Sequence, residues 1–157
     1  MKERGEKLDL NFEVFVPFEG KKAGARFGDL IEGPTIVSVY MRNNTSSCDK
    51  QMISLAQAAG AIRSKGFSII GLSKDTVGSH LKYATKHNID FTLVSDPEHR
   101  FAKATDSLVE KKMYGKAFWG PTRSAYAIDA DGKLLGIVEK VDASAHGEQV
   151  LEWLENL

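Results

Sequence analysis

The chain has 157 residues, 42% hydrophobic and 27% charged, and its 21 Lys and Arg balance its 21 Asp and Glu. This length and composition predict one globular domain over residues 1–157 with a self-sufficient core. A formal net charge of zero without a basic run argues against nucleic acid or an anionic membrane as a partner. No stretch approaches the roughly 20 apolar residues that cross a bilayer.

The amino-terminal residues and the cysteine count indicate the compartment. Residues 1–10 are mostly polar and are expected to be flexible, and no apolar segment of a secretory signal follows them. The one cysteine, Cys48, excludes an intramolecular disulfide and a zinc site built from several thiolates. We therefore expect a protein of the reducing cytoplasm.

The first half of the chain predicts strands and one long helix. Residues 12–16 alternate as a half-buried strand, and residues 19–34, with four glycines and a proline, predict turns with at most one short strand. The β-branched run at 35–40 predicts a central strand buried on both faces. From about Cys48, apolar residues recur at helical spacing until Gly66, a typical C-cap residue.

The following residues continue the alternation of strands and helices. Strands are expected at 67–73 and 91–96, and a helix capped by Asp75 or Thr76 is expected between them, to about residue 88. Pro97 is expected in the first turn of a short helix, a position that tolerates proline.

The last third predicts an irregular segment and then a hairpin. Residues 107–122 show no clean period and contain two glycines and a proline. Residues 124–129 alternate as a strand, Asp131-Gly132 signals a turn, and an antiparallel strand and a helix over 144–157 follow. The whole order predicts an α/β fold, a mixed central sheet covered by helices on both faces.

Cys48 is the main candidate for chemistry. A lone cysteine is often a small buried hydrophobe, but Cys48 follows the polar run 43–47, which is expected to lie outside the core. It also lies at the carboxyl end of a predicted central strand. Open α/β sheets place their sites at such strand ends. The first turn of a helix also offers unpaired backbone N–H groups and the positive end of its dipole, and both favour thiolate over thiol.

Thr45 and Arg123 are the other candidates, each with two interpretations. Thr45 either caps the helix or holds an oxygen substrate over the sulfur, since a hydroxyl both donates and accepts hydrogen bonds. Arg123, before the strand 124–129, is either a solvated side chain or a fixed cation beside a thiolate and a leaving oxygen.

Several segments together resemble a known family. YMRNNTSSCDKQ, around Cys48, resembles the PxxxTxxC loop of peroxiredoxins, and IIGLSKDTVGSH, LVSDPEHRFAKA, EKKMYGKAFWGPTRSAYAIDADGK and HGEQVLEWLENL follow in the order typical of the bacterioferritin comigratory protein or PrxQ group. The likeness covers nearly the whole chain from about residue 11. It implies a thioredoxin-like fold with extensions.

The resemblance implies a function for the candidate residues. Cys48 takes the place of the peroxidatic cysteine, Thr45 that of the motif threonine and Arg123 that of the active-site arginine. The chain would then reduce hydrogen peroxide and organic hydroperoxides through a sulfenic acid on Cys48, with no metal or cofactor. Members of the group occur as monomers and homodimers, and either is expected here.

Two departures from the family pattern affect these expectations. Met41 stands where the motif has proline, so the rigidity of the loop and the rate of the reaction depend on a flexible side chain. Ile53 stands where many members carry a resolving cysteine. An external thiol, from glutathione with glutaredoxin or from thioredoxin, must therefore reduce the sulfenic acid. The alternatives are a peroxide sensor with little turnover and a domain that acts only through interactions.

Overall fold

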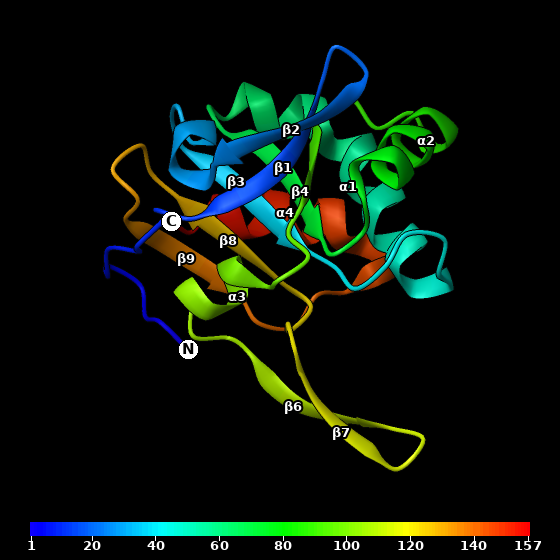
Figure 1. Ribbon diagram of the computed structural model, residues 1–157. Coiled ribbons are helices and arrows are strands. Elements are labelled where there is room, and N and C mark those ends of the chain that lie inside the picture. Colours follow the sequence, from blue (N-terminus) through cyan, green and yellow to red (C-terminus); the bar gives the residue numbers. More distant parts are fainter.

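The computed structural model describes residues 1–157 and contains nine strands, four α-helices and two short 3-10 helices (Figure 1). Their bounds are β1 Glu13–Phe18, β2 Lys21–Arg26, η1 Phe27–Leu30, β3 Thr35–Val39, α1 Ser46–Ser64, β4 Ser68–Ser73, α2 Val77–His87, β5 Thr92–Ser95, α3 Arg100–Ala104, β6 Val109–Met113, β7 Lys116–Gly120, β8 Ser124–Ile128, β9 Leu134–Val138, η2 Ala143–Ala145 and α4 His146–Leu154. No helix is both long and apolar enough to cross a membrane.

Seven strands form one mixed sheet in the order β2-β1-β5-β4-β3-β8-β9. The central strands β3, β4 and β5 are parallel, whereas β8 runs antiparallel to β3 and pairs Val39 with Ser124. All five residues of β3 are buried, as the apolar run predicts for a strand covered on both faces. The carboxyl end of β3 therefore meets the amino end of β8 at one edge of the sheet.

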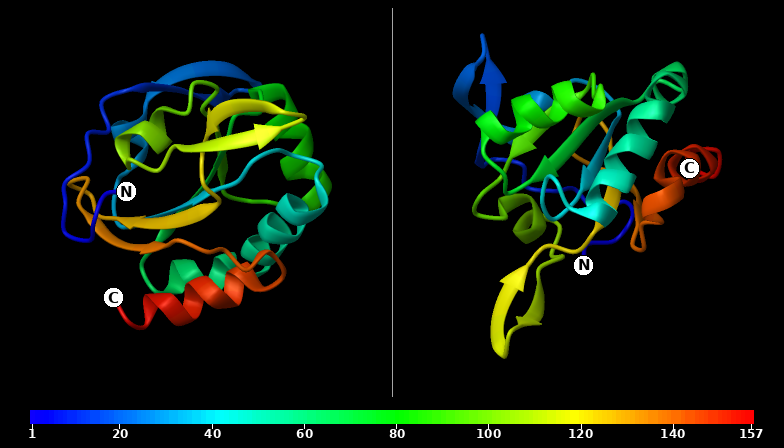
Figure 2. Two further views of the ribbon diagram at one scale, coloured as in Figure 1. Left: turned by 90° about the horizontal axis from the view of Figure 1, so that it is seen from below. Right: turned by 90° about the vertical axis from the view of Figure 1, so that its right-hand side faces the viewer.

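Helices cover both faces of this sheet, which confirms the predicted fold class. On one face, Met52, Leu55 and Ile62 of α1 pack with Val150 of α4 and Tyr83 of α2. The other face is covered by α3, η1 and the amino-terminal segment, through Phe101, Phe27, Leu8 and Leu10 among others. Figure 2 shows α1 and α4 side by side.

The segment expected to be irregular is instead a β-hairpin. Strands β6 and β7 pair antiparallel from Val109↔Gly120 to Met113↔Lys116 and form a sheet of their own. Tyr114 and Gly115 both have positive φ, as a tight two-residue hairpin turn requires. The hairpin stands away from the body of the molecule (Figures 1 and 2), so most of its side chains are exposed on both faces.

The amino-terminal segment also differs from its expectation. Residues 1–10 are predicted to be flexible, but the backbone N–H groups of Gly5 and Leu8 donate to the carbonyls of Leu134 and Gly132. Leu8 and Leu10 are buried against the sheet. Backbone hydrogen bonds and two buried leucines thus fix this segment along β9.

The boundaries of several elements follow local capping chemistry. Thr76, rather than Asp75, caps α2 by accepting a hydrogen bond from the N–H of Ser79, and Gly66 with φ of +89° follows α1 as predicted. The helix after Pro97 begins later than expected, at Arg100, because the carboxylate of Asp96 accepts from the N–H groups of Arg100 and Phe101. The region 19–34 forms β2 and η1, and so contains the one short strand allowed for it.

Candidate active site

Cys48 lies in the first turn of α1, just after the loop that connects β3 to α1. The strand ends at Val39, a loop follows over residues 40–45, and Cys48 is the third residue of α1. The backbone N–H groups of Ser46, Ser47 and Cys48 have no hydrogen-bond partner in the protein, while that of Asp49 makes the first helical bond, to Thr45. Three free donors thus surround the sulfur-bearing turn, at the end of the helix that favours negative charge.

The Cys48 side chain is buried, with 1% of its surface exposed. It lies in the same apolar cluster as Tyr40, Met52 and Tyr83. Asn43 in the preceding loop is buried as well, so the interpretation of this run as lying outside the core is wrong for that residue. The Cys48 thiol is therefore buried among apolar side chains and is not exposed to solvent.

Thr45 occupies the N-cap position of α1 but does not cap the helix with its side chain. Its backbone is extended, with φ of −117° and ψ of 145°, and its hydroxyl donates to the carbonyl of Arg42 at 2.9 Å. The capping interpretation is therefore wrong. Because the proton of the hydroxyl is committed to Arg42, the oxygen is left as an acceptor three residues before the sulfur.

Arg123 reaches the same end of the sheet from β8. Since Val39 pairs with Ser124, Arg123 lies beside the carboxyl end of β3, where the loop to Cys48 begins. Its Nη1 donates to Oε1 of Gln51 at 3.1 Å. Gln51 stands one helical turn after Cys48 on α1, so a hydrogen bond joins the guanidinium to the helix that carries the sulfur.

Gln51 is itself held by a buried polar chain. Its Nε2 donates to Oγ of Ser38 at 2.9 Å and to the carbonyl of Val39 at 3.2 Å. Ser38 also bonds Nε2 of His146 at 2.8 Å. Burial lowers the pKa of His146 to about 4, so the ring is neutral at pH 7. The amide oxygen of Gln51 is thereby directed at Arg123.

A second polar network fixes the loop before Thr45. Asn43 accepts from the hydroxyl of Tyr40 at 2.6 Å, and its Nδ2 donates to Oγ of Ser79 at 3.0 Å. The backbone N–H of Asn43 donates to the carboxylate of Asp75 at 3.0 Å. The loop is therefore braced internally by Tyr40 and anchored to α2 and to the turn between β4 and α2, without the proline of the family motif.

Two tyrosines close the apolar side of the sulfur. Burial raises the pKa of Tyr40 and of Tyr83, and the carboxylate of Asp49 adds to the rise at Tyr83 through the hydrogen bond that it accepts, at 2.6 Å. The rings of Tyr40 and Tyr83 stack with their centroids 6.3 Å apart. Both hydroxyls therefore stay protonated and serve as donors to Asn43 and Asp49.

The structure brings the three predicted residues to one end of the sheet and adds residues that the sequence analysis missed. Gln51 carries a signal in the sequence, because it is a polar residue one turn after Cys48 on the core-facing side of an amphipathic helix. Asn43 has no such signal, since its burial depends on α2. Lys111 also reaches the loop before Cys48, where its Nζ donates to Sδ of Met41, and it lies on the β6–β7 hairpin that the sequence did not predict.

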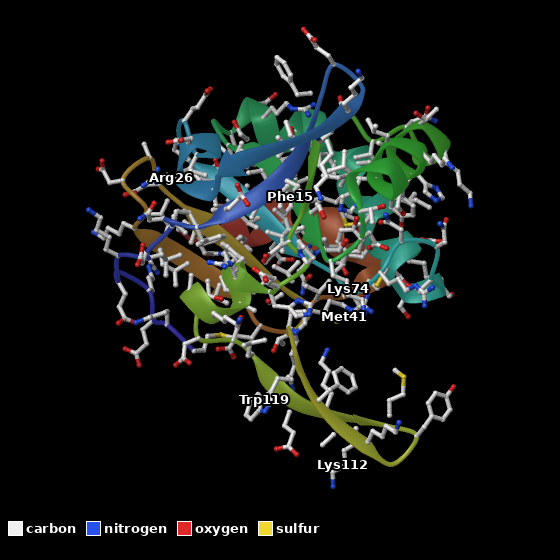
Figure 3. All side chains as sticks on the ribbon, viewed as in Figure 1. Phe15, Arg26, Met41, Lys74, Lys112 and Trp119 are labelled. Carbon is white, nitrogen blue, oxygen red and sulfur yellow. The ribbon has the colours of Figure 1, made fainter.

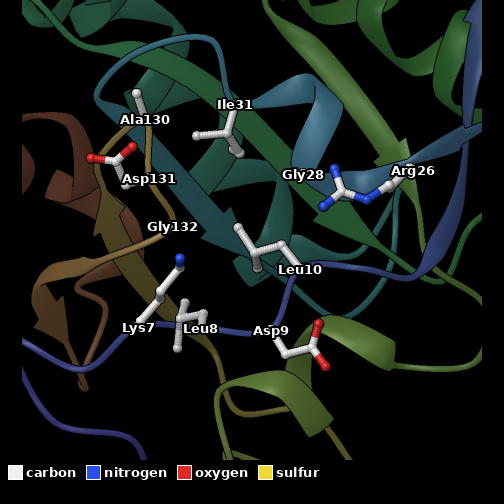
Figure 4. Close-up of a pocket in the computed structure, with 10 residues that line it drawn as sticks. All are labelled: Lys7, Leu8, Asp9, Leu10, Arg26, Gly28, Ile31, Ala130, Asp131 and Gly132. Atoms are coloured by element: carbon white, nitrogen blue, oxygen red, sulfur yellow. The ribbon is translucent and has the colours of Figure 1, made fainter.

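The hollow shown in Figure 4 lies away from these residues. It has a volume of about 510 Å³ and is lined by the amino-terminal segment, Arg26, Ile31 and the turn at Asp131-Gly132. That turn follows Ile128, which pairs with Thr35 at the amino end of β3. The hollow is thus at the opposite end of β3 from Cys48 and contains none of the residues of the candidate site.

Comparisons with known proteins agree with this geometry. A model of the AhpC/TSA family matches residues 11–137. Peroxiredoxin Bcp of Bacillus subtilis is 30% identical over 122 residues, 78% of each chain. Peroxiredoxin Bcp of Escherichia coli K12 is 30% identical over 120 residues, 76% of this chain and 77% of its own.

Solved structures show the same fold over nearly the whole chain. Peroxiredoxin Q of Xanthomonas campestris superposes with a TM-score of 0.81 at 25% identity, covering 96% of this chain and 95% of its own. A mutant of PrxQ from Xylella fastidiosa gives a TM-score of 0.85 at 24% identity, covering 99% and 97%. With its thioredoxin-like sheet and a lone cysteine at the start of α1, the chain belongs to the AhpC/TSA family, among relatives that are peroxiredoxins of the Bcp and PrxQ group.

Proposed function

We propose that this chain is a thiol-dependent peroxidase in which Cys48 attacks the peroxide and Thr45 and Arg123 hold it. The hydrogen bond from Arg123 to Gln51, one turn after Cys48, carries the proposal because it ties a permanent cation to the helix of the sulfur. Membership of the peroxiredoxin family supports the same activity. One relative, the Xanthomonas campestris protein, is described in terms of alkyl peroxide reduction.

The reaction begins with attack by the Cys48 thiolate on the terminal oxygen of a hydroperoxide. A sulfur–oxygen bond forms, the oxygen–oxygen bond breaks, and the sulfur becomes a sulfenic acid while the other oxygen leaves with the electron pair. That oxygen takes up a proton and departs as water from hydrogen peroxide or as an alcohol from an organic hydroperoxide. Two electrons pass from the sulfur to the peroxide, and no other group needs to change its oxidation state.

The surrounding groups suit the charges of this step. Free N–H groups and the positive end of the helix dipole lie at the turn that carries the sulfur, and the Thr45 oxygen accepts a hydrogen bond from the attacked hydroperoxide. Arg123 has further N–H donors besides the one on Gln51, and these stabilise the negative charge that develops on the leaving oxygen.

Return to the thiol requires an outside reductant. Cys48 is the one cysteine in the chain, so no internal disulfide can form. A first external thiol attacks the sulfenic acid to give a mixed disulfide and water, and a second thiol releases Cys48 and a disulfide. We propose glutathione with glutaredoxin, or thioredoxin, as the reductant, and a cytoplasmic site for a reaction that depends on them. Residues 1–157 act as one domain, since strands from both ends of the chain share one sheet.

The test measures peroxide consumption by the reduced protein, first in a single turnover and then with glutathione and glutaredoxin or with thioredoxin. A dimedone adduct on Cys48, detected by mass, reports the sulfenic acid. Cys48→Ser should consume no peroxide, and Ser47→Ala, at an exposed neighbour, should behave as the unmodified protein. One rapid equivalent without turnover would instead favour the peroxide sensor, and no adduct would refute the proposal.

A further inference from the structure

One side chain of the β6–β7 hairpin is directed toward the body of the protein. Lys111 is half-buried, whereas the other four residues of β6 are exposed. Figure 3 shows Met41 and Lys74 at the base of the hairpin and Lys112, the next residue along β6, pointing away from the body. The hairpin therefore presents a single cation to the site and turns its neighbour to solvent.

The Lys111 side chain is held in place along its length. Its Nζ donates to Sδ of Met41 at 3.1 Å, and Met41 is the second residue of the loop 40–45 that leads to α1. Its stem passes over Gly120, where an added Cβ would meet Cδ of Lys111 at 3.4 Å and Cε at 3.6 Å. A glycine at this point of β7 leaves room for the lysine to turn inward.

No carboxylate balances the charge of this ammonium. Lys111 forms no ion pair, and a thioether is a weak acceptor that leaves two of the three N–H donors free. Exposed lysines normally extend their charged end into water. Here the charged groups around the ammonium are Arg123, Lys74, His99 and Cys48, so the one that can become negative is the sulfur.

These surroundings make Lys111 a stronger acid than an ordinary lysine. Burial lowers its pKa most, and the neighbouring cations Arg123 and Lys74 lower it further, while the charge of Cys48 acts in the opposite direction. The negative charge of the thiolate disappears as the sulfur is oxidised. The charge of Cys48 then no longer raises the pKa of Lys111. The ammonium is thus readiest to release its proton when a leaving oxygen needs it.

The other groups at this end of the sheet are unsuited to supply that proton. Arg123 cannot give up a proton in this pH range. The Thr45 hydroxyl donates to Arg42, and the hydroxyls of Tyr40 and Tyr83 are buried donors to Asn43 and Asp49 with raised pKa values. The charge of Cys48 acts on Tyr40, Tyr83 and Lys111, and of these three groups only Lys111 has a lowered pKa.

We propose that Lys111 is the general acid of the reaction and donates a proton from Nζ to the oxygen that leaves as Cys48 attacks. This inference rests on the proposed peroxidase function. With hydrogen peroxide, the thiolate, the peroxide and the lysine proton give the sulfenic acid, water and a neutral amine. The neutral amine then regains its proton from solvent, and the cycle is balanced.

The leaving group provides a test that separates proton donation from packing or charge. Hydroxide and tert-butoxide are strong bases that need a proton as they depart, whereas acetate, which leaves from peracetic acid, does not. The variants are Lys111→Met, Lys111→Arg, and the matched control Lys112→Met on the outer face. The measurement is the second-order rate of sulfenic acid formation on Cys48 in single turnover, with each of the three peroxides, and thermal unfolding confirms that each variant is folded.

We expect Lys111→Met to react about 10²-fold more slowly with hydrogen peroxide and tert-butyl hydroperoxide, the lower end of general acid catalysis. With peracetic acid the loss should be less than about threefold, since no proton is required. Lys111→Arg should remain slow with the two hydroperoxides because its guanidinium keeps its proton, and Lys112→Met should match the unmodified protein.

Equal slowing with all three peroxides, or full activity in Lys111→Arg, would overturn the proposal in favour of packing or charge alone. Unchanged rates in Lys111→Met would overturn it while leaving the peroxidase function intact. Failure of the unmodified protein to form a sulfenic acid would overturn both, so the two failures are distinguishable.

Discussion

Arg123 donates through Nη1 to Oε1 of Gln51 at 3.1 Å, and Gln51 stands one turn after Cys48 on the same helix. The contact joins β8 to α1 across the end of the sheet. Because Gln51 is also fixed by Ser38 and by the carbonyl of Val39, the position of the guanidinium depends on the central strand. The cation and the sulfur therefore keep their relative placement as long as Gln51 keeps its bonds.

Replacing Gln51 by methionine should slow the oxidation of Cys48 without removing Arg123. We expect a rate about tenfold lower, because the guanidinium loses its fixed orientation. The free energy of unfolding should fall by about 1–3 kcal/mol, because Ser38 and Val39 lose a buried donor. Stopped-flow peroxide consumption and urea unfolding measure the two effects.

Gln57→Met is the matched control, because Gln57 is an exposed residue of the same helix. A double variant decides whether Gln51 acts through Arg123. If it does, Gln51→Met combined with Arg123→Ala should be no slower than Arg123→Ala alone. Additive losses would show that Gln51 acts on the sulfur by another route.

Arg123→Ala itself should slow the attack on hydrogen peroxide by about 10²-fold, as loss of a donor to a developing negative charge often does. Arg123→Lys should recover part of the rate, because it restores the charge without the planar donor set. Single-turnover formation of the dimedone adduct measures both variants. An unchanged rate in Arg123→Ala would remove this residue from the mechanism.

The sequence predicts the sheet and its helices because their apolar residues follow the expected periods. The run at 35–39 is apolar throughout and forms the central strand, and α1 places Met52, Leu55 and Ile62 in the core. The hairpin 109–120 has no such period, since both of its faces meet solvent and carry lysines, aromatic residues and methionine. The one available signal was Tyr114-Gly115 as a turn.

The site was predictable in part for the same physical reason. Thr45 and Cys48 are neighbours in the sequence, so a strand followed by a helix suffices to place them together. Arg123 reaches them through the register of β3 with β8, which composition and periodicity do not specify. Asn43 and Lys111 depend on contacts with α2 and Met41 that only the folded chain contains.

Asn43, rather than proline, should account for the rigidity of the loop. Asn43→Ala leaves the buried Tyr40 hydroxyl without its partner at 2.6 Å and removes the bond to Ser79. We expect a loss of about 2–3 kcal/mol in the free energy of unfolding, measured in urea. Asn44→Gly is the control, since Asn44 is exposed with φ of 62° and glycine accepts that conformation. If Asn43→Ala lost less free energy of unfolding than Asn44→Gly, this role of Asn43 would be contradicted.

His146 should make the protein less stable in mild acid. Its pKa in the folded protein is about 4 because it is buried, against about 6.5 when unfolded, so between these values the unfolded chain binds more protons. Stability should be fully present above pH 6.5 and fall as the pH drops toward 4, by about 3 kcal/mol from this residue. Buried His80, whose pKa is also lowered by burial, adds to the fall.

Urea unfolding between pH 7 and pH 4.5 tests this dependence. His146→Gln should be less stable at pH 7 but should lose less stability on acidification than the unmodified protein, since the glutamine does not titrate. An unaltered slope in His146→Gln would assign the acid sensitivity to other groups.

The hydrogen bond from Tyr83 to Asp49 should control access to the oxidised sulfur. Because Cys48 is buried, we expect a protein reductant to reach its sulfenic acid after the first turn of α1 opens. Tyr83 holds that turn to α2 through the carboxylate of Asp49 at 2.6 Å. In Tyr83→Phe the open state should be at least about tenfold more populated, because a bond to a charged group contributes about 1.5–3 kcal/mol.

Oxidation and reduction should then change in opposite directions. Reduction of the sulfenic acid by thioredoxin or glutaredoxin should become faster in Tyr83→Phe, whereas its formation should become slower, because attack on peroxide needs the folded turn. Tyr114→Phe, at the exposed tip of the hairpin, should change neither rate. Rapid-mixing measurements of each half-reaction supply the comparison. Slower reduction in Tyr83→Phe would mean that the reductant binds the protein with α1 fully folded. The opening of α1 would then play no part in the cycle.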